Sequence, residues 1–152
     1  MDYTDTRIAK LREYLFGIIN EVAENEVNQI NVDMLSNKAN DYSLDKMPMA
    51  SEVEKWIMGI EIHRDVYSFR SRKEYSQDTI NNLRNIGFFE KFEQKIKEKN
   101  EAKELPDIDY IEEIKCLNCG TMNSADTNKA VFDIQIQIKY RINKNKKNIV
   151  SL

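Results

Sequence analysis

One segment of the 152-residue chain restricts the fold more than any other, because its side chains alternate strictly between apolar and polar. The apolar positions are Phe132, Ile134, Ile136, Ile138, Tyr140 and Ile142. Successive side chains of a β-strand point to opposite faces, so this pattern predicts a long strand with one buried and one solvated face. A strand of this kind is typical of a sheet that is covered on one side.

Two helical segments can supply that cover. Residues 8–22 carry apolar side chains at steps of three and four, which predicts an amphipathic helix whose first turn is capped by Thr4 or Asp5. A second helical segment covers about residues 76–99. We expect this second helix to be broken at Gly87, because a left-handed glycine commonly ends a helix.

The rest of the pattern favours strands. Residues 53–58 and 60–69 predict a β-hairpin that turns near Gly59, because glycine adopts a positive φ without a Cβ clash. Short strands are expected at residues 30–34 and 110–117, and a polar loop at 120–128.

These elements together predict an α+β fold with a mixed, largely antiparallel sheet. The N-terminal helix and the broken second helix pack on one face of it. We expect a single domain over residues 1–143, followed by a basic C-terminal tail at residues 144–152.

The composition argues against several classes of protein. Lys and Arg number 23 against 26 Asp and Glu, which gives a net charge of −3, whereas proteins that depend on nucleic-acid affinity are usually basic. No apolar stretch approaches the roughly 20 residues of a membrane span. The N-terminus is acidic and polar, unlike a signal peptide. We therefore expect a soluble protein of a reducing cytoplasm, without a membrane partner.

Cys116 and Cys119 form the one motif with metal-ligand spacing. A tetrahedral zinc site needs four ligands, the pair supplies two, and the single histidine, His63, can add only a third. Inert structural cysteines are the more common outcome of such a pair, and a metal or redox role stays as the alternative. We expect neither a metal nor a cofactor.

Signatures of catalysis are lacking in the sequence. One histidine and no Gly-x-Ser-x-Gly run leave nothing to mark a nucleophile and its base. The 4 glycines are too scattered to form a phosphate-binding loop. We therefore expect a protein that is not an enzyme.

The order of several segments resembles a known family. These segments are Tyr42-Ser43-Leu44-Asp45 with Pro48, the run from Tyr67 to Tyr75, Gly87-Phe88-Phe89-Glu90-Lys91-Phe92 with Leu105-Pro106, and the strand that begins at Phe132. Together they resemble the small minor capsid or tail-completion proteins of tailed bacteriophages. Those proteins are often mislabelled as chloramphenicol resistance proteins and are similar to tail terminators. The resemblance covers about residues 5–143, and its specificity lies in the order and spacing of the segments.

The resemblance implies a structural protein of the virion, assembled in the cytoplasm of the bacterial host. Tail terminators have an α+β fold and form a hexameric ring that caps the tail tube and docks onto the head connector. The implied partners are therefore further copies of the chain, the tail tube protein and the head–tail connector, with a sheath protein left open. Nucleic acid is involved only as DNA that passes through the lumen of the ring.

Two sets of residues are candidates for contacts in such an assembly. Apolar side chains occur at both parities of the 53–69 hairpin, which favours helices behind it and a neighbouring subunit in front. We expect Trp56, Met58 and Tyr67 to contribute to subunit contacts. The basic tail, with Lys144, Lys146 and Lys147, is expected to contact a neighbour.

Two alternatives remain at this point. A head-side connector or stopper of the neck would use the basic tail to contact the portal or DNA. A small metal-binding or enzymatic protein would use Cys116, Cys119 and His63.

Overall fold

Two long antiparallel strands form the axis of the fold. The computed structural model describes residues 3–22, 29–47, 52–74, 79–118, 120–125 and 129–143. Within them, β4 (Ile60–Glu74) and β7 (Lys129–Asn143) pair along their whole lengths. At about 3.4 Å per residue, 15 residues give a ribbon roughly 50 Å long. The strand predicted from the alternation over Phe132–Ile142 is confirmed, and it extends further at both ends.

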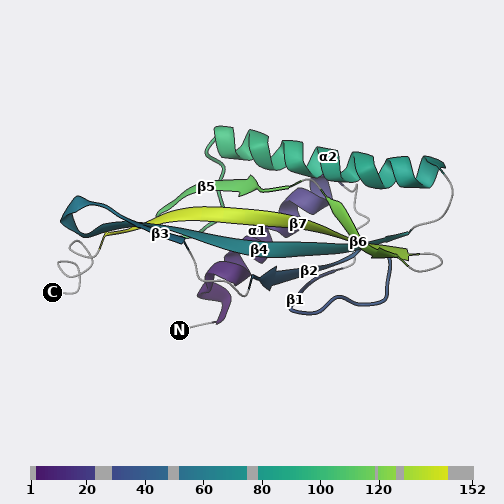
Figure 1. Cartoon of the computed structure of the whole chain (residues 1–152), viewed down its shortest axis with the longest axis horizontal. Coiled ribbons are helices and arrows are strands. Elements are labelled where there is room, and N and C mark those ends of the chain that lie inside the picture. The colour runs from purple at the N-terminus through teal and green to yellow at the C-terminus, as the bar shows by residue number, and fades with distance from the viewer. Residues whose placement is uncertain are drawn as a thin grey trace.

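Five shorter strands flank this ribbon (Figure 1). On one side, β2 (Asp41–Lys46) and β3 (Glu52–Lys55) pair with successive parts of β4, and β1 (Gln29–Val32) runs parallel to β2. On the other side, β5 (Ile111–Cys116) and β6 (Thr121–Ala125) pair with β7. All pairings except β1–β2 are antiparallel, so the mixed, largely antiparallel sheet is confirmed.

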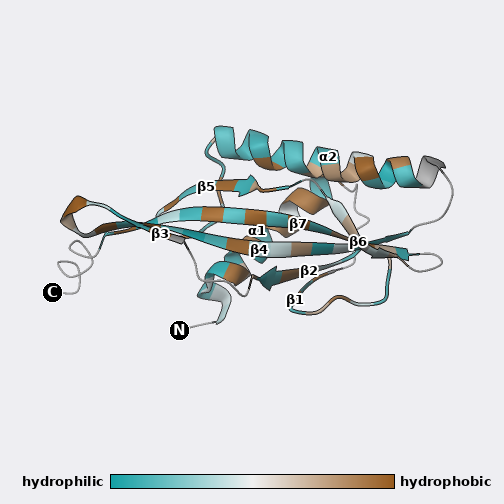
Figure 2. Ribbon diagram, in the orientation of Figure 1, coloured by the Kyte–Doolittle hydropathy of each residue, from teal (hydrophilic) through white to brown (hydrophobic). Residues whose placement is uncertain are grey.

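Both helices pack on one face of the sheet, as predicted. They are α1 (Arg7–Val22) and α2 (Thr79–Glu101), and short 3₁₀ turns occur at Tyr3–Asp5 and Ile57–Gly59. The core between helices and sheet contains Leu11, Leu15, Ile18 and Ile19 of α1, Phe89, Phe92 and Ile96 of α2, Tyr67 and Phe69 of β4, and every second residue of β7 from Ala130 to Tyr140. Figure 2 shows the hydrophobic and hydrophilic bands that alternate along β7. The α+β fold with two helices on one face is therefore confirmed.

Two details of the helices differ from the sequence prediction. Helix α2 is continuous through Gly87, which does not have a positive φ. The aromatic residues that follow, including Phe89 and Phe92, are buried against the sheet, and this packing outweighs the cost of about 1 kcal/mol for a glycine inside a helix. The cap of α1 is Thr6, whose Oγ1 accepts a hydrogen bond from the Ala9 N–H at 3.3 Å, and not Thr4 or Asp5.

The strands also depart from expectation in two places. Residues 121–125, which the sequence assigns to a polar loop, form the edge strand β6. An edge strand with exposed side chains needs no apolar alternation, so it left no signal. In the first strand, Ile30 is buried, but Val32 and Met34 are 43% and 58% exposed, and the strand ends before Met34.

No helix among the described residues is long and apolar enough to cross a membrane.

Candidate functional site

The hairpin formed by β3 and the start of β4 extends past the end of the helices (Figure 1). Its turn lies at Ile57–Gly59, where Met58 and Gly59 have φ values of 67° and 76°. The Trp56 N–H donates to the Ile60 carbonyl oxygen at 2.8 Å and closes the turn. The predicted hairpin with its turn near Gly59 is confirmed. Only glycine adopts this backbone region without a Cβ penalty, so Met58 holds a conformation that costs on the order of 1 kcal/mol.

The tip of this hairpin exposes a cluster of large apolar side chains. Ile57 is 87% exposed, Met58 75%, Trp56 54% and Val53 42%. We call these four residues the hairpin tip. Single exposed apolar residues are common on protein surfaces, but three that follow one another at a projecting turn, as Trp56, Ile57 and Met58 do, are typical of interaction sites.

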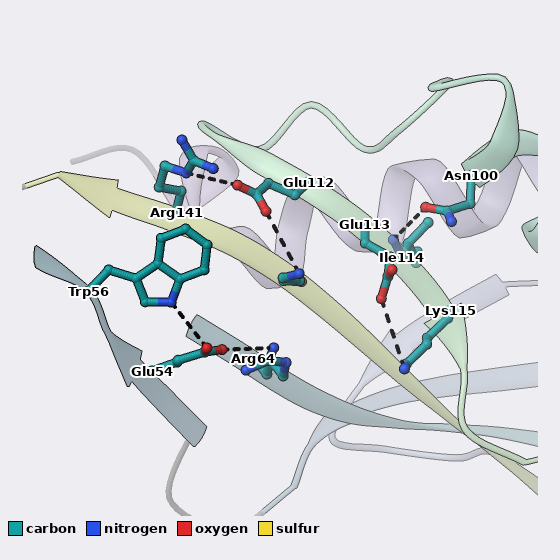
Figure 3. Close-up of polar contacts among 10 residues, drawn as sticks. Glu54, Trp56, Arg64, Asn100, Glu112, Glu113, Ile114, Lys115 and Arg141 are labelled. Carbon is teal, nitrogen blue, oxygen red and sulfur yellow. Dashed lines mark hydrogen bonds and ion pairs between the residues drawn. The ribbon is translucent and has the colours of Figure 1, made fainter. Parts of the chain in front are cut away.

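Polar contacts on the solvated face hold the base of the hairpin in place (Figure 3). The Trp56 Nε1–H donates to Glu54 Oε1 at 3.1 Å, and Arg64 Nη2 donates to Glu54 Oε2 at 3.2 Å. These bonds, first from Trp56 and then from Arg64, lower the pKa of the Glu54 carboxyl. The indole is thereby oriented by its own strand, so one edge of Trp56 is fixed while half of its surface stays exposed.

A second set of contacts joins β5 to β7 and to the end of α2. Glu112 accepts a bond from Arg141 Nε at 2.9 Å and lies 3.9 Å from Lys139 Nζ. Asn100 Oδ1, at the end of α2, accepts the outward-pointing N–H of Ile114 at 3.0 Å. Figure 3 shows the Arg141–Glu112 contact next to Trp56 of the hairpin, with Asn100 and Ile114 further along β5. They connect the edge strand β5 to the ribbon from which the hairpin projects.

On the helix face, a buried polar cluster fastens the start of α1 to the root of the hairpin. Asp65 is 1% exposed, accepts from the Tyr140 hydroxyl at 3.1 Å, and lies 3.4 Å from Arg7 Nε. The Arg7 guanidinium also lies over the Tyr140 ring at 4.6 Å. Burial, and next the Asp65 carboxylate, raise the pKa of Tyr67 and of Tyr140 to about 12. Asp65 and Tyr140 are buried, and the half-exposed Arg7 covers them from the solvent side.

The structure separates the three predicted contact residues. Trp56 and Met58 belong to the exposed hairpin tip, and their contact with a neighbour stays a prediction. Tyr67 is 2% exposed and packs in the core, so its assignment to a subunit contact is wrong. Its parity with Phe69 on β4 already places both side chains on the helix face. The basic residues Lys144, Lys146 and Lys147 lie outside the described residues.

The structure does not bring the candidate metal ligands together. Cys116 pairs with Ile136 on one side of β7, whereas His63 pairs with Tyr140 on the other side, four residues further along. The His63 ring stacks on Tyr140 at 5.3 Å, and its Nε2 lies 3.1 Å from Glu61 Oε1. Cys119 lies outside the described residues. Among the residues that are described, no group of three His, Cys, Asp or Glu side chains is placed to hold a metal ion.

One exposed apolar feature was missed by the sequence analysis. On α2, Leu83 and Ile86 are 61% and 53% exposed, and the helical spacing did not indicate which side of the helix they occupy. The core side of α2 is set by Phe89, Phe92 and Ile96. Continuing the helical period of these buried residues toward the N-terminus, through Gly87, places Leu83 on the solvent side of the helix.

No protein-family model matches this sequence, and no curated protein is similar to it.

Proposed function

We propose that this protein is a ring-forming structural subunit of a bacteriophage tail, similar to the tail terminators, which caps the tail tube and joins it to the head connector. The order of segments from Tyr42 to the β7 strand supports the family, as described for the sequence. The resemblance implies an α+β fold, and the observed architecture belongs to that class.

The observation that carries the proposal is the hairpin tip. A subunit that works by assembly needs an apolar surface that its own fold leaves uncovered, and Trp56, Ile57 and Met58 supply one at the end of the long β4–β7 ribbon. A contact between two different surfaces of identical subunits repeats around an axis and closes into a ring when the rotation allows it. Such an assembly requires no catalytic site.

The direct test adds purified protein to purified tail tubes and examines them by negative-stain microscopy, with solution mass measured in parallel. We expect rings at one end of the tubes, whether or not the subunit is monomeric on its own. A protein that stays monomeric and ignores tubes would contradict the proposal. Binding to purified head connectors without binding to tubes would instead place the ring on the head side of the neck.

The hairpin tip is tested with a matched pair of variants. Trp56→Ala and Met58→Ala should weaken ring assembly, by about 2–4 kcal/mol for a buried interface tryptophan. Met122→Ala is the control, since Met122 is 48% exposed on β6 at a distance from the hairpin. Because Trp56 is half exposed in the single chain, its removal should change the free energy of unfolding by about 1 kcal/mol or less. Equal losses of stability and assembly would assign Trp56 to the subunit's own packing.

A further inference from the structure

Strand β7 ends beside the hairpin tip (Figure 1). Its last residue, Asn143, pairs with Ile60, which directly follows the turn at Ile57–Gly59. On the other edge of β4, the Ile60 carbonyl oxygen accepts the Trp56 N–H at 2.8 Å. The backbones of Trp56 and Asn143 are therefore two strand spacings apart, about 10 Å. The residues that follow Asn143 thus start within reach of the exposed apolar side chains of the tip.

The sequence after β7 divides into a basic part and an apolar part. In order, its residues are Lys144, Asn145, Lys146, Lys147, Asn148, Ile149, Val150, Ser151 and Leu152. They lie outside the described residues. At about 3.3 Å per residue, a fully extended stretch as long as 144–148 spans roughly 17 Å, which is more than the two strand spacings between Asn143 and Trp56. The apolar part is therefore long enough in reach to meet the hairpin tip without any change in β7.

We propose that the apolar part, residues 149–152, covers the hairpin tip of its own chain in the free subunit. The described elements leave Ile57 87% exposed and Trp56 54% exposed. Burying the apolar side chains of the two segments against each other removes both sets from water, which is the main driving force for contacts of this kind. The cover depends on the chain alone, and its consequence for assembly rests on the proposed ring function.

The tether favours this segment over a second copy as the occupant. A segment joined to its target by a short linker meets it at an effective concentration in the millimolar range. Separate copies at micromolar concentration need a much larger contact, since stable pairwise interfaces bury roughly 800 Å² per partner. The few side chains of the hairpin tip offer far less than this area, so they suit an occupant that is already attached nearby.

Under the proposed function, the cover restrains assembly until subunits meet on the tail tube. Burial of a few apolar side chains is largely offset by the conformational entropy lost when the segment is ordered, so the cover is weak. A neighbouring subunit that offers a larger apolar surface to the hairpin tip displaces it. Free subunits therefore stay apart, whereas subunits held side by side exchange the cover for a contact between subunits.

Trp56 reports on the cover directly, because it is the only tryptophan of the chain. The apolar variant replaces the apolar side chains of the covering segment with serine: Ile149→Ser, Val150→Ser and Leu152→Ser. The matched control replaces the basic side chains before it: Lys144→Ser, Lys146→Ser and Lys147→Ser. In the apolar variant, we expect the emission of Trp56 to shift to longer wavelength and its acrylamide quenching constant to rise about twofold or more. The control should behave as the wild type.

A disulfide trap identifies the occupant. In a background with both native cysteines replaced by serine, a chain that carries Ile57→Cys and Val150→Cys is treated with oxidised glutathione. We expect a disulfide within one chain, so the product keeps the mass of a monomer. Met122→Cys with Val150→Cys is the control and should stay reduced, because Met122 pairs with Phe132, far along β7 from the hairpin tip.

Three results would overturn the inference. The first is a quenching constant of the apolar variant equal to that of the wild type. The second is a disulfide between two chains, or protection of Trp56 that increases with protein concentration, because either would assign the cover to a second copy. The third is an equal loss of protection in the control, which would assign the contact to the lysines.

Assembly measurements separate this inference from the proposed function. If the tip is uncovered in about a tenth of free chains, the apolar variant should self-associate about tenfold more tightly than the wild type. Unchanged association with an exposed Trp56 would refute the restraint on assembly and leave the cover standing. A wild-type chain whose Trp56 is protected but which does not bind tail tubes would contradict the ring function and support the cover.

Discussion

The close contact between Gly120 and Phe89 allows a quantitative prediction about the core. A Cβ at position 120 would lie 2.5 Å from Phe89 Cγ and within 2.9 Å of both Cδ atoms. The Phe89 ring is 3% exposed and is held between Phe88, in an edge-on contact at 5.1 Å, and Phe132 at 4.9 Å. The ring therefore cannot yield without disturbing its neighbours.

We expect Gly120→Ala to destabilise the protein by about 1–2 kcal/mol. Overpacking a core costs about 1–3 kcal/mol. Replacing glycine also restricts the unfolded chain, which returns about 0.4–1 kcal/mol. For a domain of this size the net loss should lower Tm by about 2–8 °C.

The assay is urea unfolding monitored by far-ultraviolet circular dichroism. Tryptophan fluorescence is less suitable, because the exposed Trp56 is a poor probe of the core. The same substitution is then made in a Phe89→Leu background, where the smaller side chain leaves room for the methyl group. The cost of Gly120→Ala should fall there by about 1 kcal/mol or more. An equal cost in both backgrounds would refute the steric argument.

Two further predictions concern the buried polar cluster at the root of the hairpin. Asp65→Asn should lower the free energy of unfolding by about 1–2 kcal/mol, because it removes the negative charge beside Arg7 while the Tyr140 hydroxyl can still donate to the amide oxygen. An unchanged midpoint of urea unfolding would contradict this. Tyr67 and Tyr140 have pKa values of about 12 in the folded protein against an ordinary 10, so between about pH 10 and 12 only the unfolded chain ionises and stability falls as pH rises. Tyr140→Phe should flatten this alkaline loss, and an unchanged slope in unfolding experiments from pH 9 to 12 would argue against the assignment.

Sequence patterns predicted those helices and strands that have one side in solvent and the other side against the core. The strict alternation around Ile136 and the helical stripe around Leu15 both correspond to buried faces, because the period of the element and the burial agree. The β6 strand and the continuity of α2 through Gly87 were missed, since backbone pairing and tertiary packing decide them rather than local pattern.

For the candidate site, the sequence indicated that the hairpin has exposed apolar residues, but it did not identify all of them correctly. Apolar residues at both parities of the hairpin pointed to Trp56 and Met58, which are exposed. The same reasoning misassigned Tyr67, because its parity with Phe69 places it on the face that the helices cover.

The central pairing of β4 with β7 has a consequence for how the protein is made. Every described strand hydrogen-bonds directly to β4 or β7, apart from β1, and β7 is the last of them in the chain. Even the nearest partners across this ladder, Glu74 and Lys129, are separated by the whole of α2, β5 and β6. During translation, one backbone edge of β4 therefore stays unpaired, and the helices lack the β7 part of the sheet on which they pack, until β7 has left the ribosome; this exposes the nascent chain to chaperones and to aggregation for most of its synthesis.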